Sequence, residues 1–166
     1  MSARRVLRVT AIALAVLALA AAGGAWIGAT MGLFSGKRPA GLGFDGARFQ
    51  APGDWKPNWV ASTVARDDAK HYIAPYEIGS DRARAWTALS GAVEKVPGAL
   101  IVRRDPGYLQ VEFHSKVMGF VDDAEFAMDP GGKVIHVRSA ARLGIRDFNV
   151  NRERLERLRA SVAAPG

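Results

Sequence analysis

The sequence contains no cysteine among its 166 residues. This absence excludes a disulfide framework, thiolate catalysis, an iron–sulfur site and a lipid-modified cysteine near the N-terminus. The sequence also lacks the Gly-x-Ser-x-Gly elbow of many hydrolases, a glycine-rich phosphate loop and the His-Glu-x-x-His zinc motif. These absences count against the familiar enzyme classes.

Acidic residues are absent before the first apolar run, which Arg4, Arg5 and Arg8 precede. The formal net charge of the chain is +7, with 23 basic and 16 acidic residues. Removing those three arginines leaves 23 − 3 = 20 basic residues against 16 acidic ones, or +4. Because most of these arginines have acidic neighbours, we expect no nucleic-acid partner.

Charged residues are also absent from position 9 to position 36, where the chain is strongly apolar. A span of about 20 residues crosses the bilayer core. We therefore predict an N-terminal membrane anchor or uncleaved signal over residues 1–35. A cleaved signal peptide is the alternative, since Ala20, Ala21 and Ala22 form a small-residue site. A buried core helix fits less well, because polar residues are missing for so long.

The position of the arginines before the apolar run predicts the orientation of the chain. Basic residues flank the cytoplasmic side of a membrane helix. We expect a single-pass protein of the cytoplasmic membrane with its C-terminal domain on the periplasmic or extracytoplasmic side. Residues 36–56 are rich in Gly and Pro, with little periodicity, and are predicted to be a linker. Residues 57–166 are then the exported domain.

The exported domain is predicted to be α+β. Four short runs bounded by Gly or Pro predict an antiparallel meander, and their ranges are 99–103, 108–115, 120–128 and 133–141. The segment 71–78 suits an edge strand because Pro75 interrupts it. One helix is predicted after Ser80 or Asp81, and a last one over about 150–163. The expected architecture is thus a sheet of about four to five strands packed with two helices behind a transmembrane helix.

Alternation along these strands assigns their side chains to two faces. One face is apolar and is predicted to form the core. The other is expected to be an exposed polar surface that carries Gln110, Glu112, His114, Asp123, Glu125, His136 and Arg138. A solvated ladder of charges explains this face better than a metal site does. Asp122 and Asp123 point to opposite faces of a regular strand, so they cannot share one metal ion unless a bulge intervenes. We predict no metal and no cofactor.

Asp122 is the exception in the pattern, because alternation places it on the apolar face together with Ser115 and Ser139. A buried carboxylate needs a charged partner or several hydrogen bonds. Arg142 or Arg152 could supply that partner. The resulting group is an ionic lock, a ligand pocket at the end of the sheet, or a catalytic site.

Several segments of the exported domain resemble a known family. They are 57–62, 73–75, 108–115, 119–126 and 137–142, together with Asp147, Asn151 and Arg152. This pattern is similar to the envelope family catalogued as domain of unknown function 1499, whose members are bacterial membrane or secreted proteins with plastid relatives. The resemblance covers about 57–160. It implies a candidate polar cluster of Asp122, Arg138, Ser139, Arg142, Asp147, Asn151 and Arg152, with Asp123 and Glu125 beside it, and it implies no activity.

The chain departs from the family pattern at Ala141, Arg146 and Asn149, where serine, serine and glycine are usual. Asparagine tolerates the left-handed conformation, so the change at 149 is benign. Two hypotheses of function follow. The first is a non-enzymatic module that binds an envelope protein or a small anionic ligand. The second is a hydrolase-like envelope enzyme that uses Asp122 with an arginine-lined anion site.

Overall fold

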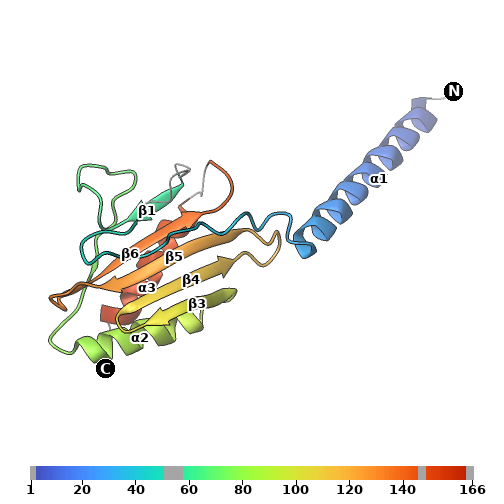
Figure 1. The fold of residues 1–166 in the computed structure, drawn as a ribbon. Coiled ribbons are helices and arrows are strands. Elements are labelled where there is room, and N and C mark those ends of the chain that lie inside the picture. The colour runs from blue at the N-terminus through green and yellow to red at the C-terminus, as the bar shows by residue number, and fades with distance from the viewer. Residues whose placement is uncertain (1–2, 51–57, 146–148, 164–166) are drawn as a thin grey trace.

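The computed structural model describes residues 3–50, 58–145 and 149–163, and its fold is α+β as predicted (Figure 1). Helix α1 (Ala3–Thr30) projects away from the rest of the molecule (Figure 1). It is long and apolar enough to cross a membrane, as the sequence predicts. The remaining elements form one layered domain.

The domain is built on a six-stranded sheet of order β1-β6-β5-β4-β3, with β2 also paired to β6. All of these pairings are antiparallel. The strands are β1 (Trp59–Ala61), β2 (Tyr76–Glu77), β3 (Ala99–Asp105), β4 (Tyr108–His114), β5 (Val121–Met128) and β6 (Val134–Ala141). The sequence predicts four to five strands, and β1 is the additional one. It is only three residues long, which is too short for alternation to reveal it.

The β5–β6 hairpin forms where the sequence predicts a turn. The carboxylate of Asp129 accepts backbone N–H bonds from Gly131, Lys133 and Val134 at 3.0, 2.7 and 2.8 Å. These bonds, with that from Val134 the largest cause, hold the pKa of Asp129 below its ordinary value. The turn fixes the register that places Phe126 opposite Val137 and Glu125 opposite Arg138.

Helices α2 (Arg82–Glu94) and α3 (Val150–Ala163) cover one face of the sheet (Figure 1). Asp81 caps α2 by accepting the N–H of Arg84 at 2.9 Å. Asn149 precedes α3 with φ 65°, the left-handed conformation expected for this residue. Between helices and sheet lies the main core, whose buried members include Tyr76, Leu89, Val93, Leu109, Val111, Phe126, Ile135, Val137, Leu155 and Leu158.

The opposite face of the sheet lies beneath residues 36–50, which we call the strap. Figure 1 shows this segment running across the strands on the side away from α3. Arg38 Nε lies 2.5 Å from Glu112 Oε1, and the backbone oxygen of Gln50 accepts a hydrogen bond from Arg138. Phe49 is buried against Tyr108 and Ala127. Much of the predicted linker therefore packs on the domain.

The expected exposed polar surface is wrong, because most of this face is buried beneath the strap. Gln110, Glu112, Asp123, Glu125 and Arg138 are all buried. Alternation assigns side chains to a face, but it does not say whether another segment covers that face. The strap has no periodicity of its own, so its own residues do not indicate that it packs there.

Candidate functional site

Asp122 lies on the helix-covered face of the sheet, as predicted, and it is paired. Its carboxylate accepts a hydrogen bond from Arg154 Nη2 at 2.8 Å, and the two side chains are only 15 % and 12 % exposed. The predicted partners, Arg142 and Arg152, are wrong. Asp122 stands near the start of β5, where the first turns of α3 pass, and Arg154 belongs to those turns. The inward carboxylate thus ties α3 to the sheet.

A short series of polar contacts extends from the Asp122–Arg154 pair, which we call the lock. Arg154 Nη1 donates to Asn151 Oδ1 at 3.1 Å, and Ser139 Oγ donates to the same oxygen. The Arg154 guanidinium also lies 4.5 Å from the ring centre of Phe113. Ser139 and Asn151 are buried. Three of the predicted site residues, Asp122, Ser139 and Asn151, therefore meet through an arginine that the sequence analysis did not select.

The other predicted site residues lie elsewhere. Arg152 donates to the backbone oxygens of Tyr72 and Lys70 at 2.8 and 3.0 Å, so it holds the loop before β2. Arg138 and Arg142 lie on the strap-covered face of the sheet. Asp147 lies outside the described residues. The structure thus divides the predicted cluster between the two faces of one sheet.

On the strap-covered face, Arg142 bridges two buried carboxylates. It donates to Asp123 through Nε and Nη2 at 2.7 Å each, and to Glu112 through Nη2 at 2.5 Å. Burial raises the pKa of Glu112, but the bonds from Arg38 and Arg142 outweigh it and hold that pKa below its ordinary value. Burial likewise lowers the pKa of Arg142, but its bonds to Asp123 and Glu112 raise it above the ordinary value. Arg142 and Arg38 together pair with both carboxylates, so the group satisfies its own charges.

A second ion pair lies beside the first. Glu125 pairs with Arg138, and Tyr108 donates its hydroxyl to Glu125 Oε1 at 2.5 Å. Burial lowers the pKa of Arg138 to about 10, so its guanidinium is charged at neutral pH. Burial also raises the pKa of the Tyr108 hydroxyl, which keeps its proton for Glu125. Arg138 lies 5.1 Å from the centre of the Phe49 ring, which belongs to the strap.

A serine–histidine contact that the sequence analysis missed lies under the same strap. Ser62 Oγ is 3.2 Å from His136 Nδ1, and it also accepts the N–H of Val137 at 2.9 Å. The ring centre of Phe44 lies 5.4 Å from that of His136. Ser62 is buried and its oxygen is already engaged by backbone, so this pair is built as a structural contact. Alternation placed His136 on this face, but nothing in the sequence pattern pairs it with residue 62.

The pH dependence of stability should report the surroundings of His136. Burial lowers the pKa of His136 below 6.5, although Asp129 raises it in part. The unfolded chain then binds a proton more readily, so stability from this residue is lost as pH falls through about 6.5 toward the folded pKa. His136→Asn should flatten this part of the curve, measured by urea unfolding between pH 7.5 and 5. Equal slopes in wild type and variant would contradict the assignment.

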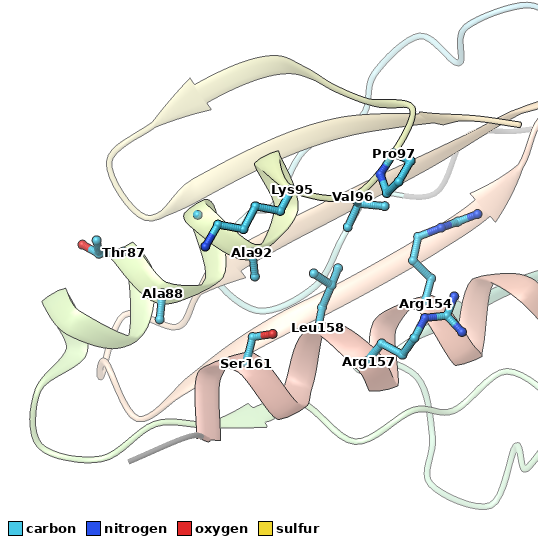
Figure 2. A pocket seen from close by; sticks show the side chains of 11 residues that line it. Thr87, Ala88, Ala92, Lys95, Val96, Pro97, Arg154, Arg157, Leu158 and Ser161 are labelled. Carbon is cyan, nitrogen blue, oxygen red and sulfur yellow. The ribbon is translucent and has the colours of Figure 1, made fainter. Parts of the chain in front are cut away.

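A pocket of about 720 Å³ lies between α2 and α3 (Figure 2). Its wall is partly apolar and partly cationic, and none of its lining residues is acidic. Figure 2 shows Lys95 reaching from α2, with Arg154 and Arg157 on the facing turns of α3. The lining residues are Thr87, Ala88, Gly91, Ala92, Lys95, Val96, Pro97, Arg154, Arg157, Leu158 and Ser161.

The pocket and the lock share Arg154. Its guanidinium is held by Asp122 and Asn151, so one cation of the pocket is fixed in place by two bonds. Arg157 is 70 % exposed, and its nearest carboxylate is that of Glu153 at 3.8 Å. Lys95 is exposed at the end of α2. Asp122 already neutralises Arg154, so Lys95 and Arg157 supply the positive charge of the pocket and Arg154 supplies a fixed hydrogen-bond donor. This arrangement suits an anionic group better than it suits proton transfer.

Within residues 3–50, 58–145 and 149–163, no group of three or more histidine, aspartate or glutamate side chains could hold a metal ion. The carboxylates of the strap-covered face explain this result, because arginines occupy the positions that a cation would take.

This fold and site define a class of protein with an apolar N-terminal helix and an α+β domain whose sheet is covered by helices on one face and by a strap on the other. Residues 52–162 match the family described as "Protein of unknown function (DUF1499)", and the chain belongs to this family, as the motifs predict. Comparison with curated proteins and with solved structures gives no match. The strap, residues 36–50, lies entirely before the matched residues.

Proposed function

We propose that this protein is a membrane-anchored module that binds an anionic ligand with an apolar part in the pocket between α2 and α3. The observation that carries the proposal is the lining of that pocket, where Lys95, Arg154 and Arg157 stand around an apolar wall without an acidic residue. An apolar surface with a few convergent cations fits an amphiphilic anion.

Binding is favoured over catalysis because the polar groups are already engaged. An enzyme that used Asp122 needs that carboxylate open to substrate, whereas Arg154 holds it at the protein interior. The carboxylates of Glu112, Asp123 and Glu125 are likewise bound to arginines. No carboxylate among these four is left in an open cleft to act as an acid or base.

The proposed location is the cytoplasmic membrane, with α1 as a single span and the domain on the periplasmic side. Arg4, Arg5 and Arg8 support this orientation, since basic residues accumulate on the cytoplasmic side of a span. From this position the pocket meets ligands of the envelope.

Filling the pocket should weaken binding strongly without unfolding the domain. Gly91 lines the pocket, and a Cβ at this position meets no atom within 4 Å. Gly91→Leu places a side chain in the pocket and removes a helical glycine, which favours α2 by about 0.5–1 kcal/mol. In nanodiscs, the full chain should bind octyl phosphate, and Gly91→Leu should weaken this at least about tenfold, a change of 1.4 kcal/mol. Calorimetric titration, with empty nanodiscs subtracted, measures both.

Three controls separate the parts of this proposal. Gly91→Ala adds only a methyl group and should bind nearly as well as wild type. Inorganic phosphate and octyl glucoside, which offer the anion alone and the chain alone, should bind more weakly than octyl phosphate. Lys95→Glu with Arg157→Glu should lose affinity, while Arg84→Glu, on α2 outside the pocket lining, should not. Unchanged octyl phosphate binding in Gly91→Leu would overturn the proposal.

A further inference from the structure

The exposed hydrophobic side chains of the domain gather at one end of it. After residue 34, the large exposed hydrophobic residues in the described part of the chain are Leu100, Val117, Phe120, Ile145 and Val150. They belong to the start of β3, the β4–β5 loop, the turn after β6 and the start of α3. In an antiparallel meander these points lie at the same end of the sheet. The Asp122–Arg154 pair brings the start of α3 to that end as well.

This end of the domain is also the end that meets α1. Gly119 has φ +68°, and a Cβ there would lie 3.2 Å from the backbone oxygen of Ala29, in the last turn of α1. Glycine therefore permits a close approach between the β4–β5 loop and the helix. Beside this contact, the rings of Phe34 and Phe120 face each other with their centres 5.8 Å apart.

The position of this contact along α1 gives its depth relative to the bilayer. Counted from Val9, the first residue after the last N-terminal charge, about 20 residues are needed to cross the bilayer core, which ends the span near Gly28. Trp26 is exposed at this level, where interfacial aromatic residues stand. Gly119 touches α1 at Ala29, about one residue or 1.5 Å further along the axis. The β4–β5 loop thus lies at the level of the lipid headgroups.

Charge at this end matches an anionic surface. Lys37 follows Gly36, which lies close to Arg142 at the end of β6. Lys116 belongs to the β4–β5 loop, and Lys95 directly follows α2. All three lysines are exposed. Basic side chains around an apolar loop are the arrangement by which peripheral domains hold anionic lipids. Each of these lysines is free to reach a headgroup while its stem lies along apolar surface.

We propose that this end of the domain rests on the bilayer, with Val117, Phe120 and Ile145 among the headgroups and the three lysines on anionic lipid. The inference rests on the proposed anchoring of the chain by α1. It adds that the domain is not merely tethered but lies against the membrane in one orientation. Lys95, at the edge of the ligand pocket, then faces the lipid from which an amphiphilic anion would come.

Depth-dependent fluorescence quenching tests this orientation. The chain has no cysteine, so each variant carries a single thiol for an environment-sensitive label. Val117→Cys and Ile145→Cys report the proposed contact, Lys133→Cys reports the opposite end of the sheet, and Leu17→Cys reports the middle of α1. In phosphatidylglycerol nanodiscs with acyl-chain spin labels near the headgroup, labels at 117 and 145 should be quenched at least about threefold more than the label at 133.

The outcomes separate this inference from the anchoring on which it rests. Strong quenching at 17 by deep spin labels, with 117 and 145 no more quenched than 133, overturns the orientation and leaves the anchor standing. Absence of quenching at 17 overturns the anchor itself. A blue shift at 117 without quenching that disappears on dilution of the protein identifies a second copy as the occupant of this end and also overturns the inference.

Discussion

Arg142→Met is expected to lower the free energy of unfolding by about 3–5 kcal/mol at pH 7, because it leaves two buried carboxylates without their shared partner. The Arg142 side chain is 6 % exposed and bonds to both Asp123 and Glu112. Arg38 still reaches Glu112, but it is half exposed and compensates only in part. Asp123 therefore carries most of the cost. Urea unfolding of the full chain in detergent, followed by tryptophan fluorescence, measures it.

A matched control comes from an exposed pair of the same kind. Arg104 lies 2.5 Å from Glu94, with both side chains about half exposed. Exposed pairs contribute about 0–1 kcal/mol, so Arg104→Met should change stability little. If the two variants were equally stable, the buried position of Arg142 would not be what gives it its effect.

The cost of Arg142→Met should also shrink in acid. In the wild type the pKa of Glu112 is held below its ordinary value, so its contribution is present above about pH 4.5 and is lost as pH falls through the folded pKa. In the variant, burial acts on Glu112 with one guanidinium fewer and raises the pKa of that carboxyl, and protonation then relieves part of the unpaired charge. The difference between the two proteins should therefore be smaller at pH 4 than at pH 7.

Local pattern was enough to predict much of the fold. The turn between the runs 120–128 and 133–141 and the last helix over about 150–163 depend mainly on neighbouring residues, and the structure has the β5–β6 hairpin and α3 at these places. The opposite directions of Asp122 and Asp123 follow from the period of a strand, and they are confirmed by partners on opposite faces.

Partners between distant segments were not predictable in the same way. Arg142, Arg152 and Arg154 are all close enough in sequence to reach a carboxylate on β5, and only the position of α3 decides among them. The strap is the larger omission, since residues without periodicity give no sign of the surface that they cover. One signal was present in the sequence: the face opposite the core carries three acids, Glu112, Asp123 and Glu125, and the alternation that places Arg138 on this face also places Arg142 there.

The pairing of these acids with arginines explains how a polar face can be covered at all. Burying a single carboxylate is costly, whereas arginines that satisfy several carboxylate oxygens offset much of that cost. Here Arg142 and Arg138 together neutralise Glu112, Asp123 and Glu125, with help from Arg38 of the strap. The strap thus supplies both a cover and a charge, which ties the segment after α1 to the centre of the sheet.

Glu125→Leu is expected to cost about 3–5 kcal/mol, because Arg138 would then be buried without its partner. Glu125 and Arg138 are 1 % and 3 % exposed, so water cannot replace the lost carboxylate. The double variant Glu125→Leu with Arg138→Met should cost less than the sum of the two single variants, by about 2 kcal/mol or more, since neither charge remains. Urea unfolding of the four proteins completes the cycle, and additive costs would contradict a direct pairing.

The double variant should nevertheless loosen the strap. Arg138 donates to the backbone oxygen of Gln50 and lies over the Phe49 ring, and methionine provides neither contact in full. Amide hydrogen exchange at residues 44–50 should therefore accelerate in the double variant, while exchange in the β4–β5 pair stays slow. The strap joins α1 to the sheet, so we expect the Glu125–Arg138 pair to help fix the position of the domain relative to the end of α1. The net contribution of the pair to the free energy of unfolding does not measure this role.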